Sequence, residues 1–117
     1  MATRAFGVVT MFDPVTHHLY DCVLRDDPAS QADTKARLRV YTGLTGNLVS
    51  ADVSGDLDAG RTATFALSRR GIGLACTVDA LPTLSATNVE LSMGVVGLEA
   101  AAVEIAFDYV VAYVPAD

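Results

Sequence analysis

Three groups of residues have the side chains that metal sites or active sites use, and the first is His17-His18 with Cys22. Imidazole and thiolate are the usual zinc ligands. If the segment is a strand, His18 and Cys22 share one face and His17 lies on the other, so the three cannot easily bind one ion. A third and a fourth ligand would have to come from Cys76 or from a distant Asp. We therefore expect no metal ion at these residues.

The second group is an acidic segment in which Asp52, Asp56 and Asp58 surround Gly55. Clustered carboxylates bind calcium through their oxygen atoms. A helix-loop-helix calcium site needs ligands at alternate positions and a bidentate Glu at the twelfth, but counting from Asp52 the twelfth residue is Ala63. The pattern is typical of a solvated acidic turn.

The third group consists of the carboxylates nearest to apolar stretches, which are Glu90, Glu99, Glu104 and Asp108. Hydrolysis by paired carboxylates needs two of them in one cleft, with one desolvated. Pairing with arginines on neighbouring strands explains them more simply. The sequence has no Gly-x-Ser-x-Gly elbow, and residues 71–73 lack the Lys and the further glycine of a phosphate loop. We therefore expect a protein that is not an enzyme and that has no catalytic residue and no cofactor.

The length and composition indicate one compact domain over residues 1–117, because 51% of the 117 residues are apolar and 19% are charged. Lys and Arg number 8 against 14 Asp and Glu, which gives a net charge of -6. This charge repels phosphate backbones and anionic lipids at long range. We therefore expect neither a nucleic acid nor a membrane as partner.

The start of the chain and its two cysteines bear on where the protein is made. No long apolar stretch follows a basic start, so we expect synthesis in the cytoplasm without a signal peptide. Cys22 and Cys76 allow a single bridge, but both lie in apolar stretches and a domain of this size does not need one. We expect two buried thiols.

Short runs with a period of two dominate the sequence, and Gly, Asp, Asn and Pro separate them. In the clearest run Leu38 and Val40 face one way while Arg37, Arg39 and Tyr41 face the other. The runs predict strands at 5–12, 18–25, 37–41, 48–53, 61–68, 71–79, 88–96 and 103–114. In the sixth and seventh runs the inward residues are predicted to be Ile72, Leu74, Cys76, Val78, Val89, Leu91, Met93 and Val95.

Three segments are less regular. Residues 98–104 have good helix propensity, but 103–114 are rich in β-branched and aromatic residues, so we expect a long strand there and keep a helix as the alternative. Residues 26–36 fit a polar loop or a short helix that begins near Asp27-Pro28. Residues 1–5 are expected to form a flexible arm.

These strands predict an all-β protein with about eight strands and at most one short helix. The expected architecture is a two-sheet antiparallel sandwich, jelly-roll-like, with a small barrel as the alternative.

Part of the surface is more apolar than a monomer needs. In the run 71–79 the face opposite the core carries small residues on which another backbone can lie closely. In the last run, 103–114, the second face of the predicted strand also carries apolar residues. The predicted self-interface consists of Gly73, Ala75, Val110, Ala112 and Val114. The alternative is that both faces of these strands are covered by the same chain.

A short acidic chain rich in Ala, Val, Gly and Asp that ends in the sequence VEIAFDYVVAYV at 103–114 resembles small virion proteins of tailed bacteriophages, and most closely capsid decoration (cement) proteins. The resemblance implies a structural protein located in the virion, commonly a homotrimer, that clamps neighbouring capsid subunits. Its implied partners are its own copies and the major capsid protein. Thr3, Arg4 and Phe6 are the expected shell-contacting arm.

The alternative function is that of a carbohydrate-binding or small-ligand-binding β-sandwich module. Aromatic side chains stack on sugar rings, and the available ones are Tyr20, Tyr41, Tyr109 and Tyr113. The lack of Trp and the aromatic content of 7% count against this alternative.

Overall fold

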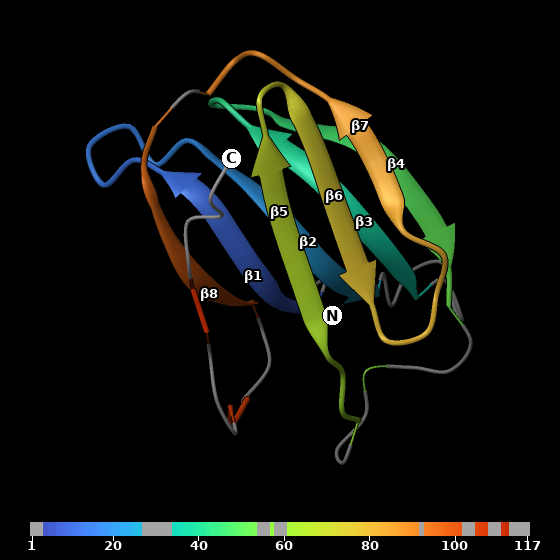
Figure 1. The fold of residues 1–117 in the computed structure, drawn as a ribbon. Coiled ribbons are helices and arrows are strands. Elements are labelled where there is room, and N and C mark those ends of the chain that lie inside the picture. Colours follow the sequence, from blue (N-terminus) through green and yellow to red (C-terminus); the bar gives the residue numbers. More distant parts are fainter. Residues whose placement is uncertain are drawn as a thin grey trace.

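The computed structural model describes residues 4–26, 34–53, 57, 61–91, 93–101, 105–107 and 111–112. These residues form eight β-strands, and no helix occurs among them (Figure 1). The strands are β1 (Arg4–Phe12), β2 (Leu19–Asp26), β3 (Lys35–Tyr41), β4 (Thr45–Asp52), β5 (Phe65–Arg70), β6 (Gly73–Val78), β7 (Leu84–Thr87) and β8 (Val95–Ala101). None of the described residues belongs to a helix long and apolar enough to cross a membrane.

The strands form two antiparallel sheets that face one another (Figure 1). The five-stranded sheet has the order β4-β3-β2-β1-β8, and the three-stranded sheet has the order β5-β6-β7. The predicted all-β sandwich is confirmed. Because β1 to β4 follow one another in one sheet and β5 to β7 in the other, the strand order is that of two meanders, whereas a jelly roll interleaves two Greek keys.

The core lies between the sheets and consists of side chains at alternate positions. From the five-stranded sheet come Tyr20, Cys22, Leu24, Ala36, Leu38 and Val40, and from the three-stranded sheet come Leu74, Cys76, Val78 and Leu84. The inward direction predicted for the third and sixth runs is thereby confirmed. Ile72 is the exception, since it lies in the turn between β5 and β6 and is 54% exposed.

Cys22 and Cys76 form a disulfide, so the expectation of two free thiols is wrong. Both residues are fully buried, and the bond joins β2 of one sheet to β6 of the other. The sequence correctly predicted that both side chains are buried. It could not show that the two strands lie opposite each other, because that depends on how the sheets stack.

The predicted strand at 88–96 is wrong, because a turn occupies its first half. The Asn88 side chain accepts a hydrogen bond from the Glu90 backbone at 2.9 Å. The buried Tyr20 hydroxyl donates to Asn88 Oδ1 at 2.7 Å and accepts from the Leu91 backbone at 3.0 Å. These bonds attach the segment to the core and end β7, since they occupy backbone groups that a ladder would use.

The predicted strand at 103–114 is also not found. Strand β8 covers 95–101 instead, which includes residues that have good helix propensity. Residues 105–107 and 111–112 are not in a strand, and the remaining residues of the segment lie outside the described part of the chain. Pairing with β1 overrides the local helix propensity of β8.

Arg4 and Phe6 lie within β1 and not in a flexible arm. Phe6 packs edge-on against Phe65 of the other sheet, with ring centroids 5.4 Å apart, and Arg4 forms an ion pair with Asp26. Thr3 lies outside the described residues, as do residues 27–33 of the predicted polar loop or short helix.

Candidate functional site

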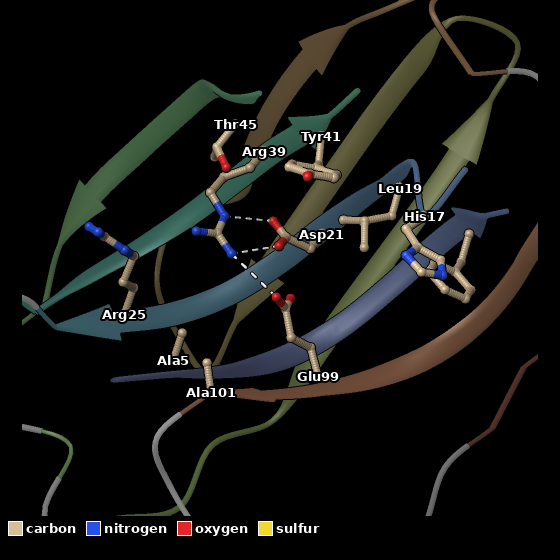
Figure 2. A pocket seen from close by; sticks show the side chains of 11 residues that line it. Ala5, His17, Leu19, Asp21, Arg25, Arg39, Tyr41, Thr45, Glu99 and Ala101 are labelled. Carbon is tan, nitrogen blue, oxygen red and sulfur yellow. Dashed lines mark hydrogen bonds and ion pairs between the residues drawn. The ribbon is translucent and has the colours of Figure 1, made fainter. Parts of the chain in front are cut away.

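Three charged side chains meet on the outer face of the five-stranded sheet, the face that points away from the core (Figure 2). Asp21 lies on β2, Arg39 lies opposite it on β3, and Glu99 lies on β8. Arg39 Nε and Nη2 donate to the two Asp21 carboxylate oxygens at 2.9 and 2.6 Å. Arg39 Nη2 is also 3.6 Å from Glu99 Oε1. One guanidinium therefore joins two carboxylates from strands that are far apart in sequence.

This contact across the sheet depends on small residues in β1, which runs between β2 and β8. On the outer face β1 presents Ala5, Gly7 and Val9, and Gly7 lies opposite Glu99. A Cβ at Gly7 would lie 2.1 Å from the backbone oxygen of Cys22, so only glycine fits there. The small residues leave room for the longer side chains of β2, β3 and β8 to meet above β1.

A cavity of about 460 Å³ surrounds the three charged residues, which is within the roughly 300–1,000 Å³ of small-molecule sites. Its lining residues are Ala5, Phe12, His17, Leu19, Asp21, Arg25, Arg39, Tyr41, Thr45, Glu99 and Ala101. Arg25 lies at one end and Tyr41 with His17 at the other (Figure 2). The His17 ring is stacked on Phe12 with centroids 5.9 Å apart.

The environment changes the protonation of Glu99. Burial, and then the hydrogen bond and negative charge of Asp21, raise the pKa of Glu99 to about 8, although the charge of Arg39 acts in the opposite direction. Glu99 Oε2 is buried and has no hydrogen-bond partner among the described residues. Burial alone would lower the pKa of Arg39, but the hydrogen bonds and charge of Asp21 raise it. Near neutral pH Glu99 therefore tends to keep its proton beside the guanidinium of Arg39.

Glu99→Gln is expected to flatten the dependence of the thermal midpoint Tm on pH. Between the ordinary pKa of 4.5 and about 8, folded Glu99 holds a proton that the unfolded chain releases. The free energy of unfolding of the wild-type protein therefore falls as the pH rises through this range. Gln cannot ionise but can still donate to Asp21. Tm measured at pH 5.5 and 8.5 should fall less in the variant, and the same fall in both proteins would contradict the raised pKa of Glu99.

A second candidate binding surface lies at one end of the sandwich, which we call the apolar end. It comprises the β1–β2 hairpin, the β3–β4 hairpin, the β5–β6 turn, the β7–β8 connection and the start of β8, all at the top of Figure 1. Each contributes large exposed apolar side chains, which are Val15, Leu44, Ile72, Val89, Met93, Val95 and Val96. Large apolar groups gathered on a surface are typical of protein–protein contacts.

Local bonds hold these hairpin tips in place. Asp13 Oδ1 accepts hydrogen bonds from the backbone of Val15 at 2.8 Å and of Thr16 at 3.3 Å, and these bonds hold the pKa of Asp13 below its ordinary value. Gly43 in the β3–β4 hairpin has a φ of +100°, which favours glycine. The exposure of Val15 and Leu44 therefore follows from ordered turns.

The structure describes three of the five residues of the predicted self-interface, which are Gly73, Ala75 and Ala112. Gly73 and Ala75 lie together on β6, half-buried and facing away from the core. Ala112 is exposed and is not in a strand. Val110 and Val114 lie outside the described residues. Val95, which the sequence predicted to face inward, is exposed on β8, as is its neighbour Val96.

The structure separates the predicted aromatic and metal-binding candidates. Tyr20 is fully buried and cannot stack on a sugar, whereas Tyr41 lines the cavity. Tyr109 and Tyr113 lie outside the described residues. Cys22 is bonded to Cys76 and is not available as a metal ligand. In the described part of the chain, no three His, Cys, Asp or Glu residues are grouped to hold a metal ion.

The sequence analysis expected Glu99 to pair with an arginine across strands, and Arg39 is such a partner. It did not single out Asp21, although opposite charges stood at outward positions of neighbouring predicted strands. The place of Glu99 on β8 beside β1 was not predicted, because it depends on a long connection. The comparisons with known proteins add no further residues: the chain matches no protein-family model, no curated protein sequence and no solved structure.

Proposed function

We propose that this protein is a non-enzymatic structural protein that acts as a homo-oligomer on a larger protein assembly, as a capsid decoration protein does on a virion. The observation that supports this most is the exposed apolar surface of β8. Among the described strands β8 is an edge strand, because it pairs with β1 on one side only. Val95, Val96 and Leu98 on this strand are all exposed.

An exposed edge strand with apolar side chains favours pairing with another chain. Its free backbone groups can extend a sheet, and its side chains gain about 1.5–3 kcal/mol each when fully buried. If β8 of one copy meets a different surface of the next copy, head to tail, the copies close into a ring, and a trimer is the ring we propose. Each contact alone is weak, but the ring links several contacts and so raises the overall affinity.

The loop tips of the apolar end, apart from β8, supply a further surface for contact with the assembly itself. In this proposal the copies meet along β8 and the loop tips with Val15 and Leu44 contact the shell protein of a virion. The net charge of -6 suits an outer surface better than one that faces packaged nucleic acid.

Val96→Arg is expected to convert the oligomer into a folded monomer, because it places a charge in the middle of the proposed contact. Val96 is already 57% exposed in the single chain, so the substitution should leave the fold intact. Sedimentation equilibrium measures the mass, and circular dichroism checks the fold. Ala66→Arg is the matched control, since Ala66 is an exposed residue on β5 in the other sheet. An oligomer that persists in Val96→Arg would remove β8 from the contact.

The cavity favours a second candidate function, which is that of a β-sandwich module that binds a small ligand. It combines hydrogen-bonding groups in the Asp21–Arg39–Glu99 group with an aromatic ring, Tyr41. The cavity lies on the outer face of the sheet and includes Glu99 and Ala101 of β8, whereas the exposed apolar residues of β8 are Val95, Val96 and Leu98.

A further inference from the structure

We propose that the cavity on the outer face of the five-stranded sheet binds a short acidic saccharide, with Arg25 pairing to a carboxylate of the sugar chain. This inference rests on the second candidate function, ligand binding, and names the class of ligand. It does not depend on the oligomer formed through β8.

The first argument is the local charge. Half of the 8 Lys and Arg residues of the chain stand on the outer face of β2 and β3, and these are Arg25, Lys35, Arg37 and Arg39. Arg39 and Lys35 are paired with Asp21 and Asp52 on the same face, so within the cavity Arg25 is the cation that can attract a small anion. The repulsion from the net charge of -6 counts most against a long polyanion.

The second argument is the difference between the two arginines that line the cavity. Arg39 is held by Asp21 and lies close to Glu99, so its charge is already compensated. Arg25 forms no ion pair with any residue that the structure describes, and it is half-buried at the end of the cavity. A carboxylate on the ligand fits this guanidinium, which can bind it through two parallel hydrogen bonds.

The third argument concerns the middle of the cavity. Because Asp21, Arg39 and Glu99 compensate one another, this part needs no further charge from a ligand. It offers carboxyl oxygens that accept hydrogen bonds and guanidinium N–H groups that donate them. Hydroxyl groups do both, so the centre fits the hydroxyls of a sugar.

The fourth argument is the length of the site. Leu19 pairs with Tyr41 and Arg25 pairs with Lys35, so the two ends of the cavity are six residues apart along β2. At about 3.4 Å per residue this is roughly 20 Å, which is longer than a single sugar ring. Tyr41 and the stacked pair of His17 and Phe12 then provide ring surfaces at the end opposite Arg25. The site fits a chain of a few sugar rings.

Calorimetric titration with two matched probes tests the proposal. Trigalacturonate carries carboxylates, and maltotriose is a neutral chain of the same number of rings. We expect trigalacturonate to bind at least tenfold more tightly than maltotriose. Arg25→Gln should weaken the binding of trigalacturonate at least tenfold, and added salt should weaken it as well. The control is Arg70→Gln, an exposed arginine on β5 outside the cavity, which should leave binding unchanged.

The outcomes separate the ligand class from the site. Equal binding of the two probes overturns the acidic ligand but leaves a saccharide site. Unchanged binding by Arg25→Gln overturns the pairing of the carboxylate with Arg25. Binding of neither probe overturns the saccharide proposal. The mass of the oligomer is measured independently and is unaffected by any of these results.

Discussion

Replacing Cys22 and Cys76 together by alanine is expected to lower the free energy of unfolding by about 4 kcal/mol. The two residues are 54 positions apart, and the bond removes the entropy of that long loop from the unfolded chain. It also joins the two sheets at the centre of the core, where both side chains are fully buried. Urea denaturation of the double variant and of the oxidised wild-type protein measures the difference.

The control for the disulfide is the wild-type protein denatured with and without a reductant. Reduction should shift the wild-type curve most of the way to that of the double variant. Native protein should resist reduction, because the buried sulfur atoms become accessible only on unfolding. Equal stability of all three samples would contradict a bridge between the sheets. Bridges of this kind persist in oxidising surroundings and are rare in the reducing cytosol.

Asp21→Ala is expected to lower the free energy of unfolding by about 3–5 kcal/mol, because it leaves the guanidinium of Arg39 largely buried without its main partner. The side chains of Asp21 and Arg39 are only 3% and 13% exposed. Urea denaturation at pH 7 measures the loss. Replacing both partners, with Asp21→Val and Arg39→Met, should recover much of it, since the guanidinium that Asp21→Ala leaves without its main partner is then gone.

Asp52→Ala provides the matched control for a cross-strand ion pair. Asp52 pairs with Lys35 on the same sheet, but its side chain is 88% exposed. The charge and hydrogen bond of Lys35 lower the pKa of Asp52, yet solvent screens an exposed pair. Asp52→Ala should therefore hardly change the free energy of unfolding. If Asp21→Ala and Asp52→Ala lower the free energy of unfolding by similar amounts, then burial of the Asp21–Arg39 pair does not explain its contribution to stability.

The first six strands could be predicted from the sequence to within a few residues, because each has one face in the core. Leu38 and Val40 of β3 alternate with the outward Arg37 and Arg39, and the structure follows this pattern. The last two strands could not be predicted. The turn that ends β7 depends on the hydroxyl of Tyr20, which is 68 residues from Asn88 in the sequence. An alternating pattern in the local sequence contains no information about that bond.

The candidate site was predicted less well than the fold. Asp21 and Arg39 stand on adjacent strands, so their pairing follows from register, but Glu99 reaches them only because β8 returns beside β1. The apolar end likewise depends on which loops lie at the same end of the sandwich. Val15 and Leu44 are separate single residues in the sequence, and only the strand order brings their turns together.

Light scattering behind a sizing column, at two protein concentrations, tests the central proposal of a self-associating structural protein most directly. The proposal predicts a mass that is a multiple of 12.3 kDa, with three copies as the expected number, at both concentrations. A mass of 12.3 kDa at both concentrations would contradict it, because the exposed residues of β8 would then not bind a second copy.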